Sequence, residues 1–207
     1  FIWFKNFSNI IVMDIIENYY KDNKEGFLEI VLGSMYSGKT SRLIETYYKC
    51  LSCNIPCIIV NHSDDTRYHN TMLSNHNKVM ISCLQYNLLN EFIINETSKL
   101  VPGTIILINE AQFFPDLFNS IIHLTEKQFF RVALYGLDGD FERKPFGDIL
   151  NLIPYCNNVI KLHAYCYDCK NGKKGIFSKR ITEEKDQKLV GSSNYKPLCR
   201  KCFLKST

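Results

Sequence analysis

Apolar and polar residues follow one another along this chain in a pattern that predicts strands and helices in turn. Short apolar runs without a helical period are separated by longer stretches that are apolar on one side only. The strand-like runs are residues 27–32, 56–60, 79–84, 104–108 and 131–137; the helix-like runs are residues 40–53, 86–100, 115–127 and 146–153; residues 63–78 read as a polar loop. Such alternation, with nearly continuous apolar strands, predicts an α/β fold: a parallel sheet with helices on both faces.

Polar residues or glycines stand at the ends of four strand-like runs. They are Gly33, Asn61, the adjacent pair Asn109 and Glu110, and Asp138. The carboxyl ends of parallel strands meet at one edge of a sheet, and ligands bind along this edge in open α/β sheets. The pattern therefore predicts a ligand site to which these residues contribute.

The first 26 residues lack this pattern and predict no element of the fold. Residues 1–16 are apolar but are broken by charged and amide side chains, so they predict neither a membrane span nor a signal peptide. Residues 18–26 read as a polar linker. The chain opens on Phe1, which is consistent with a fragment or a translated upstream stretch, and Met13 is a candidate start.

Composition places the chain among ordinary soluble globular proteins. Of its 207 residues, 45% are hydrophobic and 22% are charged, which suits one domain with at most a small appendage. The net charge of +4 is unevenly spread, because residues 161–207 hold 12 Lys and Arg against 4 Asp and Glu, a net +8 that leaves −4 for the rest. A basic tail indicates an anionic partner such as nucleic acid or phosphate, or no specific partner.

Residues 33–41, GSMYSGKTS, match the phosphate-loop pattern of glycine, four residues, glycine, lysine and a hydroxyl residue. Gly33 and Gly38 allow the backbone to approach a phosphate chain closely, so that the loop N–H groups can bind it. The helix that follows points its positive end at the anion. Lys39 supplies a cation for the outer phosphates, and the Thr40 hydroxyl can bind Mg²⁺. The alternative is a chance glycine-rich turn, but the strand-like and helix-like flanks favour nucleotide binding.

A second polar cluster follows the strand-like run at 104–108. In phosphate-loop enzymes this position usually carries an Asp that holds Mg²⁺ through water, whereas this chain has the neutral Asn109. Glu110 is then the first carboxylate available, either to position Mg²⁺ or to accept a proton from an attacking hydroxyl. The alternative is a solvated acid at a strand end; a phosphate loop in the same sheet favours a catalytic role.

Two Cys-x-x-Cys pairs, CYDC at 166–169 and CRKC at 199–202, predict a metal site. Four thiolates suit a tetrahedral Zn²⁺, and a site closed by four cysteines is structural rather than catalytic. The predicted ligands are Cys166, Cys169, Cys199 and Cys202. The 29 residues between the pairs exceed the usual spacing, so they form a long excursion whose glycines and lysines suit a mobile hairpin or lid. Two unrelated cysteine pairs are the alternative.

The other cysteines are predicted to be core thiols, and the histidines show no ligand spacing. An odd count of nine cysteines beside a phosphate loop argues against a secreted disulfide scaffold and favours a reducing compartment. The cysteines outside the two pairs lie in apolar runs: Cys50, Cys53, Cys57, Cys83 and Cys156.

Taken together, these segments resemble the type II thymidine kinases, the cytosolic kind. The resemblance runs from about residue 26 to residue 203 and rests on GSMYSGKTS at 33–41, DTRY at 65–68, NEAQFFPDL at 109–117, LDGDFERKPFGDILNLIP at 137–154, CYDC and CRKC. It implies a phosphate-loop (RecA-like) parallel sheet flanked by helices, with a small C-terminal zinc-binding lasso or lid domain. The implied division is an unassigned extension at 1–26, a nucleotide-binding domain at 27–158 and the lasso domain at 159–207.

The resemblance implies transfer of the ATP γ-phosphate to the 5′-hydroxyl of thymidine or deoxyuridine, giving dTMP for DNA precursor synthesis by salvage. It makes Glu110 the general base. The implied ATP-binding residues are Gly33, Ser34, Met35, Tyr36, Ser37, Gly38, Lys39, Thr40, Asp65, Arg67, Asn109 and Gln112. The implied nucleoside-binding residues are Met35, Phe141, Asp186, Gln187, Lys188, Leu189, Val190 and Tyr195. In this scheme Phe141 offers its ring face to the base, and the lasso meets the base mainly through backbone groups.

The resemblance also implies cofactors and partners. These are Mg²⁺ with ATP, a structural Zn²⁺, assembly into a homotetramer, a cytoplasmic location, and no nucleic-acid or membrane partner. Inhibition by the end-product triphosphate is a further expectation.

Three features depart from the family pattern. Asn109 replaces an Asp, Asp140 replaces what is more often a small hydroxyl residue, and the first 26 residues have no counterpart. The first two leave open a weakened kinase or a non-catalytic nucleotide-binding protein. The basic segment beside a zinc site leaves open a nucleic-acid-binding ATPase.

Overall fold

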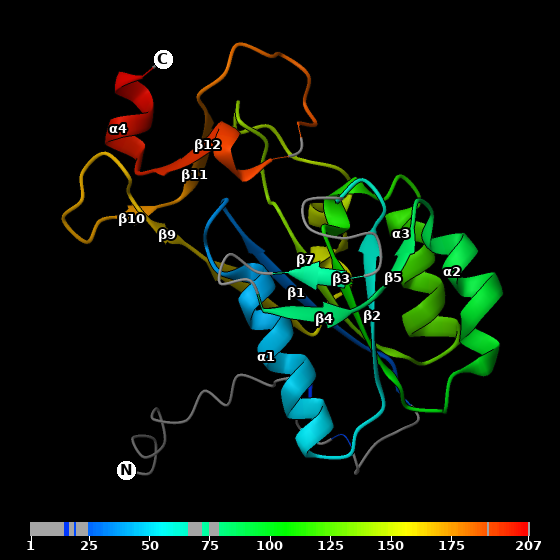
Figure 1. Cartoon of the computed structure of the whole chain (residues 1–207). Helices are drawn as coiled ribbons and strands as arrows, with labels where there is room; N and C mark the ends of the chain where they lie inside the picture. The colour runs from blue at the N-terminus through cyan, green and yellow to red at the C-terminus, as the bar shows by residue number, and fades with distance from the viewer. Residues whose placement is uncertain are drawn as a thin grey trace, which may run out of the picture.

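The chain forms a central sheet, and a smaller C-terminal unit lies beside the carboxyl edge of that sheet (Figure 1). The computed structural model describes residues 15, 16, 19, 25–65, 72–74, 79–189 and 191–206, with the backbone alone described at residue 192. No helix among these residues has the length and apolar character needed to cross a bilayer.

Six strands form the central sheet, and all neighbouring pairs are parallel. The strands are β1 (Phe27–Gly33), β2 (Cys57–His62), β5 (Leu84–Tyr86), β6 (Ile105–Asn109), β7 (Arg131–Gly136) and β8 (Asn158–Leu162). Their order is β5-β2-β6-β7-β1-β8. The predicted α/β fold with a parallel sheet is therefore confirmed.

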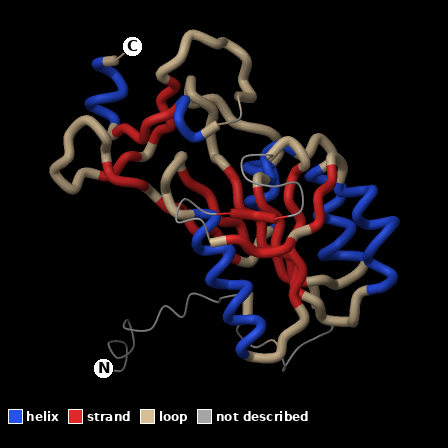
Figure 2. The backbone as a smooth tube through the Cα atoms, viewed as in Figure 1, coloured by secondary structure: helices blue, strands red, loops and turns tan. Residues whose placement is uncertain are grey.

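Helices cover both faces of the sheet (Figures 1 and 2). The helix α1 (Lys39–Ser52) lies on one face, and α2 (Leu89–Glu96) packs beside α3 (Leu117–Ile122) on the other. Shorter helical segments are η1 (Thr97–Lys99), η2 (Ala111–Phe113), the π-helical η3 (His123–Lys127) and η4 (Ile149–Tyr155).

Alternation along each strand sends side chains into two separate cores. On β6, Ile106 and Ile108 join the core beneath α2 and α3, whereas Ile105 and Leu107 join the core beneath α1. Strands that are buried on both faces read as continuous apolar runs, which is why the sequence predicted them. Truncation of one such side chain to Ala lowers the free energy of unfolding by about 2–5 kcal/mol. The two cores therefore stabilise the sheet that carries the polar residues at its edge.

Two predictions about local structure are wrong. The single strand predicted over 79–84 is two strands: β4 (Met80–Ser82) pairs antiparallel with β3 (Met72–Ser74), and β5 joins the edge of the sheet. Because β3 lies inside the segment predicted as a polar loop, that loop prediction also fails. Strands of three residues are too short to show an alternating pattern.

The edge strand β8 was not predicted. Its sequence NVIKL alternates between partly buried and exposed residues, and the exposed Lys161 breaks the apolar run. It pairs with β1 in parallel, so the sheet continues to Leu162, across the division implied between residues 158 and 159.

The described part of the first 26 residues contributes to the core. Ile15 and Tyr19 are buried in the core beneath α1. The Nε–H of Arg131 donates a hydrogen bond of 2.8 Å to the carbonyl of Ile15. No element was predicted here, because residues 1–26 show no periodic pattern of apolar and polar positions.

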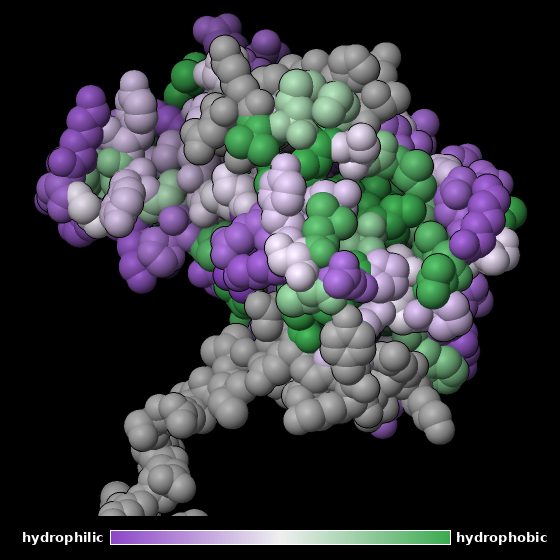
Figure 3. Space-filling model, turned by 60° about the horizontal axis from the view of Figure 1, so that its bottom comes forward, coloured by the Kyte–Doolittle hydropathy of each residue, from purple (hydrophilic) through white to green (hydrophobic). Residues whose placement is uncertain are grey.

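The C-terminal unit consists of two small antiparallel pairs and one helix. The strand β9 (Ala164–Tyr165) pairs with β10 (Lys174–Gly175), and β11 (Phe177–Arg180) pairs with β12 (Tyr195–Leu198). The helix is α4 (Arg200–Lys205), and the turn η5 (Ser192–Asn194) precedes β12. The outward surface of the C-terminal unit, at the left of Figure 3, is mostly hydrophilic. Residues 181–194, which join β11 to β12, are called the lasso loop below.

Candidate active site

The phosphate loop leaves the end of β1 and leads directly into α1. A Cβ on Gly33 would lie 2.6 Å from both the Leu162 carbonyl oxygen and Ser37 Oγ, so this position requires glycine. Gly38 precedes α1 with a φ of 89°, a left-handed conformation that glycine adopts without strain. Lys39 Nζ donates to the carbonyls of Gly33 and Ser34, at 3.0 and 2.9 Å, and so lies back across its own loop.

This loop fits the phosphate chain of a nucleotide. Ser37 Oγ is buried and has no hydrogen-bond partner among the described residues. Its hydroxyl can therefore donate a hydrogen bond to a phosphate oxygen bound in the loop. The positive end of the α1 helix dipole adds to the positive potential there. Thr40 is the second residue of α1, a position from which its hydroxyl suits the Mg²⁺ that accompanies ATP.

The phosphate loop also touches the C-terminal unit. Ser34 Oγ donates to the Gly175 carbonyl at 2.9 Å, and the Met35 N–H donates to Ser178 Oγ at 2.9 Å. Gly175 and Ser178 belong to β10 and β11, so direct hydrogen bonds fix the unit that carries the lasso loop to the phosphate loop.

A buried polar network joins the ends of β2 and β6. Asn109 Nδ2 donates to Asn61 Oδ1 at 2.8 Å, and Asn61 Nδ2 lies 3.4 Å from both Asp65 Oδ2 and Gln85 Oε1. Asn109 is 2% exposed. The amide that replaces the expected Asp is therefore committed to a neighbouring strand. Arg67, the other predicted residue of the DTRY segment, lies outside the described residues.

Glu110 follows β6 and is held by Gln112. Its φ of 50° is in the left-handed region, a conformation that costs a non-glycine residue about 1 kcal/mol or more. Gln112 Nε2 donates to Glu110 Oε2 at 2.7 Å, while Gln112 Oε1 accepts from the Leu137 N–H at 3.0 Å. The carboxylate is thus oriented by a side chain that is itself fixed to the end of β7.

Glu110 lines a cavity with mainly apolar walls. The lining residues are Met35, Asp65, Glu110, Phe113, Leu137, Phe146, Leu189, Gly191 and Tyr195. Met35, Leu189 and Tyr195 were predicted to bind the nucleoside. Phe113, Leu137 and Phe146 were missed as wall residues, although all three lie in the segments NEAQFFPDL and LDGDFERKPFG that carry the resemblance.

The predicted aromatic platform, Phe141, is absent from this lining. The Arg180 guanidinium carbon lies 3.9 Å from the centre of its ring and covers one face. Stacking of Phe141 on a base therefore stays a prediction that concerns its other face.

Contacts between side chains fix the lasso loop to the sheet. Gln187 Nε2 donates to Asp140 Oδ2 at 2.8 Å. Lys188 forms an ion pair with Asp64, and its Nζ lies 4.6 Å from the ring centre of Phe113. Asp186 is exposed, and Val190 lies outside the described residues.

His62 is a further residue of this site that the sequence did not single out. It ends β2, is 4% exposed, and its ring packs edge-on against Phe113 and Phe114. Burial, followed by the nearby Lys188, lowers the pKa of His62 to about 4. Its Nδ1 accepts the Asp64 N–H at 3.1 Å, as a neutral imidazole can.

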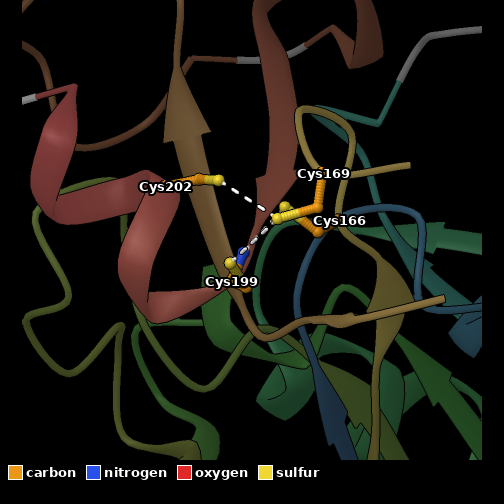
Figure 4. Close-up of side chains that lie close together, drawn as sticks. All are labelled: Cys166, Cys169, Cys199 and Cys202. Carbon is orange, nitrogen blue, oxygen red and sulfur yellow. Dashed lines mark hydrogen bonds between the residues drawn. The ribbon is translucent and has the colours of Figure 1, made fainter. Parts of the chain in front are cut away.

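Four cysteines converge in the C-terminal unit (Figure 4). The sulfur atoms of Cys166, Cys169, Cys199 and Cys202 all lie within 4.8 Å of one another. Two of the distances are 3.3 and 3.6 Å, from Cys169 to Cys202 and to Cys199. Zn–S bonds of about 2.3 Å in a tetrahedron place sulfurs about 3.8 Å apart, so the cluster fits Zn²⁺.

The surroundings favour a thiolate at this cluster. Burial raises the pKa of Cys166, but hydrogen bonds from backbone N–H groups, led by that of Cys199, outweigh it and lower the pKa to about 6. The thiolate is the form that binds a metal. Of the cysteines outside the cluster, Cys50 is buried as predicted, and Cys57, Cys83 and Cys156 are partly buried and pack against the two cores. Cys53 is exposed, so the prediction of a core thiol is wrong at this position.

Comparisons with known proteins identify relatives over most of the chain. A family profile described as "Thymidine kinase" matches residues 26–203. The thymidine kinase of Mycoplasma mobile is 38% identical over 190 residues, which cover 89% of this chain and 90% of that protein. Those of Yaba monkey tumor virus and of vaccinia virus strain Western Reserve are 34% and 35% identical, over 89% and 87% of this chain and 98% of each relative. The chain therefore belongs to the thymidine kinase family.

Proposed function

We propose that this chain is an enzyme that transfers the γ-phosphoryl group of ATP to the 5′-hydroxyl of thymidine, and of deoxyuridine. Membership of the thymidine kinase family supports this reaction. The observation that carries it is that one cavity is lined both by Met35 of the phosphate loop and by Glu110. A phosphoryl donor and a hydroxyl acceptor can therefore meet beside a proton acceptor.

In the proposed reaction Glu110 is the general base. It accepts the proton of the 5′-hydroxyl as this oxygen bonds to the γ-phosphorus and the bond to the β-phosphate oxygen breaks, which releases ADP. Gln112 keeps the carboxylate in position. Lys39 and the loop N–H groups bind the phosphates. When bound, Mg²⁺ neutralises phosphate charge; Thr40 would hold it, whereas Asn109 offers only a neutral amide.

The apolar walls and the lasso loop complete the proposed pocket. Phe113, Leu137 and Phe146 form surfaces for the base. Closure of the lasso loop excludes water, which protects ATP from hydrolysis. Zn²⁺ bound by the four cysteines is structural in this scheme, because it holds the ends of the segment that carries the loop.

Location and assembly are proposed from the resemblance alone. They are a cytoplasmic homotetramer that binds neither nucleic acid nor membrane. Light scattering on the purified protein tests the assembly. Titration with duplex and single-stranded DNA at physiological salt tests the nucleic-acid alternative, which requires binding under those conditions.

Turnover of a nucleoside panel with Mg·ATP tests the function. Thymidine, deoxyuridine, deoxycytidine and deoxyguanosine are compared for the wild-type chain, Glu110→Gln, and the surface control Glu91→Gln. We expect selective phosphorylation of thymidine and deoxyuridine, and a loss of about 10²–10⁴-fold in kcat for Glu110→Gln with thymidine binding retained. The control should match the wild type.

Two results would contradict this proposal. Near-normal turnover by Glu110→Gln would remove Glu110 as the base. A folded, ATP-binding wild-type chain that phosphorylates no nucleoside would instead identify a non-catalytic nucleotide-binding protein, and Asn109 would be the next residue to change.

A further inference from the structure

Arg180 is the last residue of β11 and lies immediately before the lasso loop. It is 5% exposed, which is unusual for a residue that carries a permanent charge. Its cross-strand partner is Tyr195, the first residue after the loop. The base of the loop is closed by the Ile181 N–H, which donates to the Asn194 carbonyl at 2.9 Å. Arg180 thus stands where the loop begins and ends.

The guanidinium group binds the interior of this loop. Its NH1 nitrogen donates to the carbonyls of Glu184, at 2.9 Å, and Asp186. Its NH2 nitrogen donates to the Gln187 carbonyl at 3.2 Å and to the Tyr195 hydroxyl at 2.6 Å. Four of the five N–H groups of an arginine are therefore used within the segment 184–195, and the fifth, on Nε, is buried without a partner among the described residues.

These contacts extend to both sides of the predicted nucleoside pocket. The Tyr195 hydroxyl, held by Arg180, donates in turn to the Leu189 carbonyl at 3.1 Å, and both residues line the cavity. On its other side the guanidinium lies against the ring of Phe141. One side chain therefore connects the lasso loop, a cavity-lining tyrosine and the loop that follows β7.

We propose that Arg180 is the positioning residue that sets the lasso loop in its closed, nucleoside-binding conformation. This inference rests on the proposed function, because it assigns the loop to the thymidine pocket. The loop offers few apolar contacts of its own, since residues 181–187 are all exposed. Charge-assisted hydrogen bonds to its carbonyls therefore supply the order that a hydrophobic core supplies elsewhere.

The planar geometry of arginine is central to this role. A lysine would keep the charge, but it has only three donors on one nitrogen and cannot reach carbonyls at both ends of a guanidinium fork. Arg180→Lys should consequently behave like Arg180→Ala and not like the wild type.

Steady-state kinetics and limited trypsin digestion test the proposal on the zinc-loaded chain. The variants are Arg180→Ala, Arg180→Lys, and Lys179→Ala as the control. Lys179 is adjacent on β11, but its Nζ lies 5.1 Å from the ring centre of Phe203, which belongs to α4. Zinc content and affinity for a fluorescent ATP analogue establish that each variant is folded.

We expect the KM for thymidine to rise about tenfold or more in both Arg180 variants, and the KM for ATP to change less than about twofold. Tryptic cleavage after Lys185 and Lys188, mapped by mass spectrometry, should become several-fold faster, and thymidine should protect the variants less than the wild type. Lys179→Ala should match the wild type in both KM values, in the rate of tryptic cleavage and in the protection by thymidine.

Wild-type values of the thymidine KM and of cleavage in Arg180→Ala would overturn the proposal. So would restoration of both by Arg180→Lys, because the planar fork would then be dispensable. If the wild-type chain phosphorylates no nucleoside, the proposed function fails; cleavage in the absence of ligand still reports whether Arg180 orders the loop.

Discussion

At the carboxyl edge of the sheet, the burial of single side chains determines their protonation state. His62 is the clearest case, because its imidazole packs edge-on against two phenylalanine rings and lies near Lys188. With a pKa of about 4 it stays neutral through the physiological range. A charged histidine here would repel Lys188, which links the lasso loop to Asp64.

This environment predicts a specific dependence of stability on pH. Between about pH 6.5 and pH 4 the unfolded chain binds a proton at His62 that the folded chain does not bind, so the stability falls as the pH falls. From pH 7.5 to pH 5 this residue should account for a loss of about 2 kcal/mol in the free energy of unfolding. Urea unfolding of the wild type and His62→Gln at both pH values measures it. The wild type should therefore lose about 2 kcal/mol more than His62→Gln, and equal losses would contradict the assignment.

The amide of Asn109 predicts a cost for restoring the usual acid. In Asn109→Asp a carboxylate oxygen would face Asn61 Oδ1, and a turn of the Asn61 amide would break its contacts with Asp65 and Gln85. Without nucleotide, we expect the free energy of unfolding to fall by about 1–3 kcal/mol. Urea unfolding measures it, with Asn171→Asp as the control, since that exposed side chain acts only as an acceptor for the Lys173 N–H. An unchanged stability would show that the network tolerates the charge.

At the scale of elements, the hydrogen bonds in the loop after β7 show what Asp140 does where the family more often has a small hydroxyl residue. Asp140 Oδ1 accepts the N–H groups of Glu142 and Lys144, both at 2.9 Å, while Oδ2 accepts from Gln187. The carboxylate therefore closes a turn and holds the lasso loop. A small hydroxyl residue, the expected type at this position, can accept a turn hydrogen bond in the same way but is shorter.

This turn predicts a graded response to substitution. Asp140→Ala leaves two backbone N–H groups without their acceptor and should lower the free energy of unfolding by about 1–2 kcal/mol. Asp140→Ser keeps an acceptor and should lose less than half as much. Thermal or urea unfolding of the three chains tests this order, and a serine variant as unstable as the alanine variant would contradict it.

Elements with a strong pattern were predictable, and those without one were not. Buried strands such as β6 and β7 could be predicted because both of their faces are buried and their sequences are nearly continuous apolar runs. The edge strand β8 and the short hairpin of β3 and β4 carry too few apolar positions to show a period. Three of the four hydrogen bonds of Arg180 end on backbone carbonyls, which every sequence possesses, so the sequence could not predict them.

At the scale of the whole molecule, the four-cysteine cluster connects the C-terminal unit to the pocket. The buried core of this unit consists of Leu198, Phe203 and two of the cysteines, Cys166 and Cys199. The same unit contacts the phosphate loop through Ser178. A fold this small has little apolar core of its own, so its stability should depend on the metal.

Metal removal should accordingly separate two functions of the chain. We expect one Zn²⁺ per chain, and its removal by a chelator, or the change Cys199→Ser, should lower thymidine phosphorylation at least tenfold while ATP binding by the sheet changes far less. Metal analysis and a fluorescent ATP analogue measure both effects. The control is Cys53→Ser, an exposed thiol outside the cluster. Full zinc content in Cys199→Ser would refute the site.

The order of the elements along the chain has a consequence for synthesis in the cell. All six strands of the sheet, and the phosphate loop with them, precede residue 163, whereas β12 and the second cysteine pair follow residue 194. On the ribosome the strands of the sheet can therefore emerge while the C-terminal unit is still incomplete. A nascent chain halted in that interval would carry the phosphate loop but lack the second cysteine pair, so the four-cysteine cluster could assemble only after the last residues had emerged.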